Sequence, residues 1–272
     1  MRLFVVLATL IIGMLGSVYL TGKLGDVALN LAFSAFGFLL GYQFYLPKGM
    51  RLQAILASTL FRWRRIRVSV SYLVNIEVEG RYLLVRGNRI RTQFQPVGGV
   101  FKVRQNIWEQ LTRELSIEPD KRFLPDADNA YDLRLFLHGK NLPRLLDWIA
   151  EMKEIEAAPW REFSEELIVT GILSAENFRH GHFERARRRH HDGIRYDEYS
   201  KGLQIIIADI YTFYPNPSQA AELKMLVEKS SGVGVEPGEF IFVDHEQLSR
   251  TSPARDSRVH FEITPTAKWL IK

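Results

Sequence analysis

The stretch "APWREFSEELIVTGIL", residues 158–173, decides the fold. A proline near its start suits the first turn of a helix, and charged residues then alternate with apolar ones. At helical spacing Glu162 and Glu166 lie one above the other, with Glu165 beside them. Like charges on one face cost stability unless a cation such as Arg161 lies among them. The stretch therefore predicts an amphipathic helix whose acidic face is either a metal site or a solvated surface.

The N-terminal part of the chain is unusually apolar. Residues 3–22 and residues 27–47 contain no charged side chain, and each run is about as long as the roughly 20 residues that a helix needs to cross a bilayer. A signal peptide would show one short apolar core followed by soluble sequence, whereas here a second run follows directly. The pattern predicts a transmembrane hairpin over residues 1–47.

The charge distribution places the rest of the chain relative to this expected hairpin. Residues 48–70 contain six basic and no acidic side chains, which is typical of a cytoplasmic juxtamembrane segment, so we expect a basic linker over 48–67 and both termini in the cytoplasm. The whole chain carries +5, of which residues 1–47 contribute +1 and residues 48–70 contribute +6, so residues 71–272 carry −2. The remaining domain is therefore not generally basic, and we expect no DNA or RNA polymer as a partner.

From about residue 68 the pattern changes to alternating strands and helices. The stretch "RYLLVRGNRIRTQFQPVGG", residues 81–99, predicts a strand, a tight turn at Gly87-Asn88, and a second strand that ends at Pro96. Further along the chain, the pattern predicts a helix at 105–116, a strand at 131–138, a helix at 141–153, two long strands within 177–200 and 202–215, and a helix at 217–230.

The acidic helix, combined with the strand that ends in "PVGG", resembles the Nudix fold. The matching helix residues are Arg161, Glu162, Phe163, Ser164, Glu165 and Glu166. The resemblance implies an α+β fold, a cytoplasmic Nudix-like α/β/α sandwich with a mixed sheet over residues 68–272 and a long insertion at about 103–158. In Nudix hydrolases such glutamates hold Mg²⁺ against a diphosphate, because hard cations prefer oxygen ligands. A hydrolase would therefore use Glu162, Glu165 and Glu166 as metal ligands.

Several departures from the Nudix pattern favour binding over hydrolysis. Asp147 and Lys153 stand where the family has a glycine and a glutamate, and Ile168 stands where it has a glycine. More than 50 residues separate "PVGG" from the helix, instead of a short loop. We therefore assign no catalytic residue and expect no cofactor. The alternative is a membrane-anchored Nudix hydrolase of nucleoside diphosphate derivatives, which would need Mg²⁺.

Two apolar segments followed by a divergent Nudix domain resemble the transmembrane Nudix effectors of bacterial CBASS antiphage systems. This resemblance implies that the domain senses a cyclic oligonucleotide made by a partner nucleotidyltransferase. It also implies that ligand-driven self-association disrupts the inner membrane and causes abortive infection. The expected partners are thus a cyclic oligonucleotide, membrane lipid and further copies of the chain.

A cyclic oligonucleotide needs guanidinium groups for its phosphates and planar or amide groups for its bases. The candidate ligand-binding residues are Arg91, Gln93, Gln95, Arg161, Glu165, Glu166, Arg179, Arg187 and Tyr196. Other roles remain open for each group. The arginine-rich stretch also fits a solvated strand, the alternating residues 91–95 also fit an exposed sheet edge, and the glutamates also fit a structural cluster neutralised by Arg161.

Overall fold

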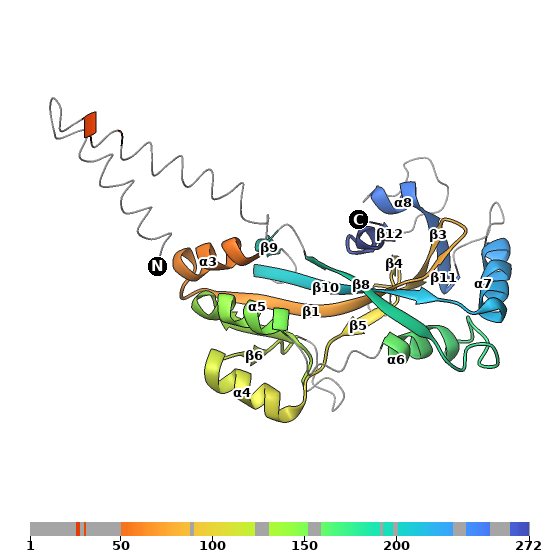
Figure 1. Ribbon diagram of the computed structural model, residues 1–272, viewed down its shortest axis with the longest axis horizontal. Helices are drawn as coiled ribbons and strands as arrows, with labels where there is room; N and C mark the ends of the chain where they lie inside the picture. The colour runs from red at the N-terminus through yellow and green to blue at the C-terminus, as the bar shows by residue number, and fades with distance from the viewer. Residues whose placement is uncertain are drawn as a thin grey trace. The chain divides into compact units, whose positions relative to one another are not determined.

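A computed structural model describes the following parts of the chain: residues 26–27, 30, 50–87, 90–122, 131–151, 159–190, 193–197, 201–230, 238–250 and 262–271. By their internal contacts the residues form two units, Met1–Ile55 and Leu56–Lys272. Helix α3 (Met50–Leu60) begins in the first unit and ends in the second. All other elements described below belong to the second unit (Figure 1).

The larger sheet is built on two long strands that run side by side. Strands β1 (Arg65–Asn75) and β10 (Gly202–Tyr214) are parallel and stay in register from Ile66 opposite Leu203 to Asn75 opposite Thr212. Within the described residues the strand order is β6-β7-β1-β10-β8, with β5 also paired to β1 and β9 to β10. The remaining strands of this sheet are β5 (Gly98–Val100), β6 (Glu118–Pro119), β7 (Arg134–His138), β8 (His182–His190) and β9 (Arg195–Asp197).

The larger sheet is mixed, as expected, but the unit also contains a second sheet that we did not expect. Its described order is β11-β3-β4-β12, with β2 paired to β3. Its strands are β2 (Glu77–Val78), β3 (Arg81–Arg86), β4 (Gln93–Gln95), β11 (Phe240–Asp244) and β12 (Glu262–Ile263). The chain reverses at Glu79-Gly80, where both residues have positive φ, and this reversal joins β2 to β3 within the second sheet. Strand β3 also pairs with β4 and β11.

The expected strand pair around the "GNR" turn is confirmed, because β3 and β4 are antiparallel neighbours. The connection is wider than a two-residue turn: the Gly87 N–H donates to the Gln93 carbonyl over 2.7 Å, and the Gln93 N–H donates to the Ile90 carbonyl over 2.9 Å. Asn88 itself lies outside the described residues.

The insertion is an integral part of the larger sheet. It contains α4 (Gln105–Leu115), η2 (Gly139–Asn141) and α5 (Leu142–Glu151), close to the helices expected from the sequence. Strand β7 pairs with the first half of β1, and β5 pairs with the second half. Figure 1 shows α4 and α5 together on one side of the long strands. The insertion therefore completes the edge of β1 where β5 leaves it.

The acidic helix and the C-terminal elements complete the unit. The helix consists of α6 (Pro159–Phe163) and a π-helical turn, η3 (Ser164–Ile168). The C-terminal helices are α7 (Pro217–Ser230), α8 (His245–Ser249) and η4 (Ala267–Leu270). The expected helix at 217–230 is confirmed in full.

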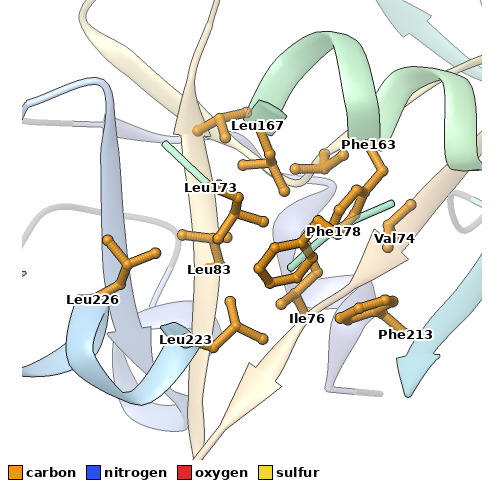
Figure 2. Close-up of a cluster of buried hydrophobic side chains, with 12 residues drawn as sticks. Val74, Ile76, Leu83, Phe163, Leu167, Leu173, Phe178, Phe213, Leu223 and Leu226 are labelled. Carbon is orange, nitrogen blue, oxygen red and sulfur yellow. The ribbon is translucent and has the colours of Figure 1, made fainter. Parts of the chain in front are cut away.

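The apolar face of the acidic helix is buried in one core cluster. Figure 2 shows Phe163 and Leu167 among Val74, Leu83 and Phe213, which come from strands of both sheets. Phe163 and Leu167 are fully buried. Burying each such side chain stabilises the fold by about 2 kcal/mol. This packing fixes the helix against the sheets and leaves its charged residues to face elsewhere.

The transmembrane hairpin expected in residues 1–47 is the main correction. In the described part of the chain, no helix has both the length and the apolar composition needed to cross a bilayer. The longest helix with described bounds, α7, has only 14 residues, whereas a crossing takes about 20. Apart from residues 26–27 and 30, the expected hairpin lies outside the described residues. The finding contradicts the expected fold class, of which the hairpin was a part, and the inner-membrane location derived from it.

Candidate functional site

The acidic helix does not keep regular α-helical geometry through its glutamates. From Ser164 the helix widens into a π turn, and the Val169 N–H donates to the Ser164 carbonyl over 2.9 Å. A π turn changes the angular spacing of side chains, and such turns are frequent at functional sites. Glu165 is exposed, whereas Glu166 is turned inward and accepts a hydrogen bond from the Gly98 N–H over 3.3 Å.

The two glycines of "PVGG" allow this close approach of helix and strand. A Cβ at Gly98 would overlap the Tyr72 carbonyl oxygen on the neighbouring strand, and a Cβ at Gly99 would overlap the Glu162 carboxylate. Only residues without a side chain permit such contacts. The sequence element that suggested the fold is therefore the element that brings the glutamates against β5.

The electrostatics of the helix face are dominated by burial. We call Arg161, Glu162, Glu165 and Glu166 the helix wall. Burial raises the pKa of Glu166 to about 8, the neighbouring Glu162 charge adds to this, and the Gly98 N–H opposes it. Burial also raises the pKa of Glu162, while Arg161, whose Nη2 lies 2.8 Å from Glu162 Oε1, opposes the rise. Arg161 also hydrogen-bonds the Tyr72 hydroxyl. Near neutral pH, Glu166 is thus mostly an uncharged acid.

The helix wall does not fit a magnesium site as it stands. Among the residues that the structure describes, no three carboxylate, histidine or cysteine side chains are grouped closely enough to hold a metal ion. Glu162 is engaged by Arg161, and Glu166 is engaged by a backbone N–H. Mg²⁺ needs ionised oxygen ligands in near-octahedral geometry, which these contacts do not provide. The use of Mg²⁺ therefore stays a prediction attached to the hydrolase alternative.

The helix wall borders a polar cavity of about 670 Å³, within the usual range for small-molecule sites. Its floor is the face of β1 that carries Arg67, Ser69, Ser71 and Leu73, together with Ile206 of β10. The second sheet and the C-terminal segment contribute Gly87, Ile90, Gln93, Gln95, Pro96 and Thr266. The cavity thus lies where the helix, both sheets and the insertion meet.

The insertion supplies a further side of the cavity. Lys102, at the edge of the insertion, forms a β-bridge with Asp132, and Arg134 lies opposite Ser69 in the β1–β7 pair. We call Lys102, Asp132 and Arg134, all of which line the cavity, the insertion wall. Arg134 Nη2 is 3.7 Å from Asp132 Oδ2. This wall therefore combines two cations with one carboxylate.

Arg67 is the buried cation of the cavity floor. Its side chain is 10% exposed, its Nε donates to Asp120 Oδ2 over 2.7 Å, and its Nη1 donates to Gln204 over 3.1 Å. Burial alone would raise the pKa of Asp120, but hydrogen bonds from Arg122 and Arg67 outweigh it and lower the pKa to about 2. Asp120 therefore stays ionised and fixes the Arg67 guanidinium.

The structure brings five of the nine candidate ligand-binding residues together. The five that line the cavity are Gln93, Gln95, Arg161, Glu165 and Glu166. Gln93 also donates to Glu262 over 2.9 Å. The other four are not among the cavity-lining residues. Each has a different setting, which explains why residue type alone did not place it.

Arg91 is exposed and lies 3.1 Å from Glu239. Arg187 donates to the carbonyls of Trp269 and Leu270 at the end of η4. Arg179 is exposed, and Tyr196 is 61% exposed on β9. The arginine-rich strand therefore serves in part to hold the C-terminal segment in place.

Sequence reasoning missed the cations that the structure adds to the cavity, which are Arg67, Lys102 and Arg134. For Arg67 a signal was present. In "RVSVSY", residues 67–72, polar side chains alternate with apolar ones, which on a strand places Arg67, Ser69 and Ser71 on one face. For Lys102 and Arg134 the sequence held no such signal, because their position depends on how β7 pairs with β1.

Comparisons with known proteins agree with this architecture. Searches of curated proteins and of solved structures found no match to the chain. The family model described as the SMODS-associated NUDIX domain matches residues 65–271, which begins at the first residue of β1 and ends within the last described turn. This match supports a Nudix effector associated with CBASS defence. Because the match covers well over half of its length, the chain belongs to the SMODS-associated NUDIX domain family.

Proposed function

We propose that this protein is a receptor for a cyclic oligonucleotide, which it binds in the cavity between the helix wall and the insertion wall without cleaving it. The observation that carries the proposal is the lining of the cavity, which offers cations, amides and hydroxyls from several elements around one open pocket. Such convergent polar groups in a preformed pocket are typical of a small-molecule site.

The charge of the cavity suits an anion. The lining contains four cations and four carboxyl groups: Arg67, Lys102, Arg134, Arg161, Asp132, Glu162, Glu165 and Glu166. Because burial raises the pKa of Glu166 to about 8, this carboxyl is mostly uncharged at neutral pH. The cavity therefore carries a net charge of about +1 or more, and guanidinium groups are well suited to phosphate.

The polar neutral groups suit the bases. Gln93 and Gln95 on β4 both face the cavity, and a carboxamide has donors and an acceptor that match the edge of a base. Leu73, Ile90 and Ile206 add apolar surface to the same lining. No aromatic ring is among the described lining residues. We therefore expect base recognition by hydrogen bonds and aliphatic contact more than by stacking.

The hydrolase alternative makes a different demand on the same helix. It needs Glu162, Glu165 and Glu166 to ligate Mg²⁺, whereas Glu162 accepts a hydrogen bond from Arg161 and Glu166 accepts one from the Gly98 N–H. We therefore favour binding without turnover, with hydrolysis as the outcome that would replace it. The membrane-disrupting output expected from the sequence depended on the hairpin and is not part of this proposal. Contact with lipid and assembly with further copies stay predictions.

The test is isothermal titration of the full-length chain with cyclic dinucleotides and trinucleotides, with Mg²⁺ present and the ligand analysed afterwards. We expect one of these ligands to bind and to be recovered intact. Arg161→Gln removes a cavity cation and should weaken binding about tenfold or more. Arg179→Gln is the matched control, because Arg179 is exposed and does not line the cavity, so it should bind like the wild type.

Three results would overturn the proposal. Turnover of a cyclic ligand, or of a nucleoside diphosphate derivative, that is lost in Glu166→Gln would establish the hydrolase. Equal loss of binding in Arg161→Gln and Arg179→Gln would place the ligand elsewhere on the protein. The absence of binding by every cyclic ligand tested would remove the receptor function itself.

A further inference from the structure

The insertion does more than extend the sheet. Its pairing with β1 also determines which of its side chains lie at the cavity. Strand β7 takes over as the partner of β1 just where β5 ends: the Val70 N–H donates to the Leu133 carbonyl over 2.9 Å, and the Phe101 N–H donates to the Val70 carbonyl over 3.1 Å. On either side of this junction, Arg134 lies opposite Ser69, and Val100 lies opposite Ser71. Side chains of the insertion therefore meet the polar face of β1 in a defined register.

A buried ion cluster beside this junction holds one cation of the cavity floor in place. One carboxylate, Asp120, is shared by Arg67 and Arg122, with N–O distances of 2.7 Å to each. Asp120 has no exposed side-chain surface, and Arg67 is nine-tenths buried. A guanidinium taken out of water needs such partners. Asp120 and Gln204 therefore fix the Arg67 guanidinium, which lines the cavity.

The insertion wall adds further cations to the cavity lining. Lys102 and Arg134 line the cavity with Asp132 as the carboxylate of the wall. Together with Arg67, this side of the lining has three cations and one carboxylate. The helix wall, in contrast, has one cation and three carboxyl groups. The positive charge of the cavity is therefore concentrated on the side of the insertion, away from the residues of the Nudix pattern.

We propose that Arg67, Lys102 and Arg134 form an anion subsite that is separate from Arg161 on the helix wall, so that one ligand uses both. This inference depends on the receptor function proposed above and narrows its ligand class. A ligand with phosphates at two separated positions, such as a cyclic oligonucleotide, fills both subsites, whereas a mononucleotide fills only one. The insertion contributes Arg134 to this subsite, while Arg67 comes from β1 and Lys102 lies at the edge of the insertion. None of the three belongs to the Nudix pattern of the acidic helix.

The test compares four single and two double variants of the full-length chain, each checked for an unchanged melting temperature without ligand. Lys102→Gln and Arg134→Gln remove cations of the insertion wall that are not fully buried. Arg161→Gln removes the cation of the helix wall, and Arg91→Gln is the control outside the cavity. We expect each of the first three to weaken the cyclic ligand at least tenfold. The double variant Arg134→Gln/Arg161→Gln should bind a cyclic ligand no better than it binds the matching mononucleotide.

A second readout separates this inference from the receptor proposal. Pyrophosphate alone, used as a probe in thermal denaturation, should raise the melting temperature of the wild type and of Arg161→Gln, but not that of Lys102→Gln/Arg134→Gln. If pyrophosphate stabilises all variants equally, the insertion subsite is refuted. If pyrophosphate stabilises the wild type but not Lys102→Gln/Arg134→Gln, while no cyclic ligand binds, the subsite is supported and the receptor function is refuted. If cyclic ligands bind to Lys102→Gln and Arg134→Gln like the wild type, the subsite is likewise refuted.

Discussion

The helix wall and the insertion wall border the same cavity, but the buried carboxyl groups beside them have pKa values shifted in opposite directions. On the helix wall, burial raises the pKa of Glu166 to about 8, so the group avoids its charge at neutral pH. Beside the insertion wall, two guanidiniums hold Asp120 ionised with a pKa of about 2. At neutral pH the Glu166 carboxyl group is therefore mostly uncharged, whereas Asp120 stays charged because two guanidinium groups pair with it.

This difference bears on function because the two walls have different origins. The helix wall carries the motif that resembles hydrolases, yet its carboxyl groups do not form a metal-binding group among the described residues. The insertion wall belongs to no such motif, yet it brings the excess of cations to the cavity. In the receptor proposed above, the motif helix therefore acts mainly as scaffold, and the insertion wall supplies cations for the ligand.

The largest expected effect comes from disturbing the packing of β5 against β1, beside the helix wall. Gly98→Ala would place a Cβ onto the Tyr72 carbonyl oxygen and 3.0 Å from the Leu73 Cα, and backbone cannot yield as a flexible side chain does. We expect a loss of about 4 kcal/mol in the free energy of unfolding, measured by urea denaturation. Gly238→Ala is the control, since a Cβ there meets no atom within 4 Å. Similar stability for both variants would contradict the close packing of β5 on β1.

The next effect tests whether the ionised Asp120 carboxylate stabilises the fold by pairing with Arg67. Asp120→Asn leaves Arg67 buried without its carboxylate, which should cost about 3 kcal/mol at pH 7. The pKa of Asp120 is lowered from its ordinary value near 3.8 to about 2, so its contribution is present above pH 4 and is lost as the pH falls through 2. The stability difference between wild type and variant should therefore shrink between pH 4 and pH 2. A difference that stays constant over this range would show that the charge of Asp120 is not what matters.

The elements of the fold were largely predictable because they depend on local patterns. The β-branched and aromatic residues of β3 and β10, and the Pro217-Ser218 start of the helix at 217–230, indicate two strands and a helix without reference to the rest of the chain. The division into two sheets was missed, because strand patterns do not say which strands pair. The hairpin was predicted from two uncharged apolar runs, and the part of the chain that the structure describes contains no helix that could cross a bilayer.

The site was predictable only where its residues are close in sequence. The helix wall comes from six consecutive residues, so its members were found together. The cluster of Arg67, Asp120 and Gln204 joins positions 53 and 137 residues apart, and no local pattern marks such a contact. The same reason explains the misplaced Arg187: an arginine in a basic run gives no sign that it binds the carbonyls of Trp269 and Leu270.

A smaller effect, with the opposite sign, tests whether Glu166 is uncharged in the folded protein near neutral pH. Glu166→Gln keeps an acceptor for the Gly98 N–H but cannot ionise. Because the pKa of Glu166 is raised from about 4.5 to about 8, the folded wild type loses stability as the pH rises through this range. We expect the variant to be more stable than the wild type by about 2 kcal/mol at pH 9 and nearly equal at pH 5, measured by thermal denaturation. Glu165→Gln, at an exposed position, should change stability much less. A wild-type pH profile parallel to that of Glu166→Gln would refute the buried neutral acid.

The smallest effect isolates burial as the cause of the difference between the walls. Arg65 and Glu118 repeat the pairing of Arg67 and Asp120 two residues earlier in the chain, with nearly the same N–O distance, 2.6 Å against 2.7 Å. Their side chains are 51% and 54% exposed, whereas those of Arg67 and Asp120 are 10% and 0% exposed. Water screens the exposed pair, so Glu118→Gln should cost less than 1 kcal/mol in urea denaturation and less still in high salt. A cost close to that of Asp120→Asn would mean that the pairing of β6 with β7 requires both charges, and burial would then no longer explain why Asp120 holds its pKa so low.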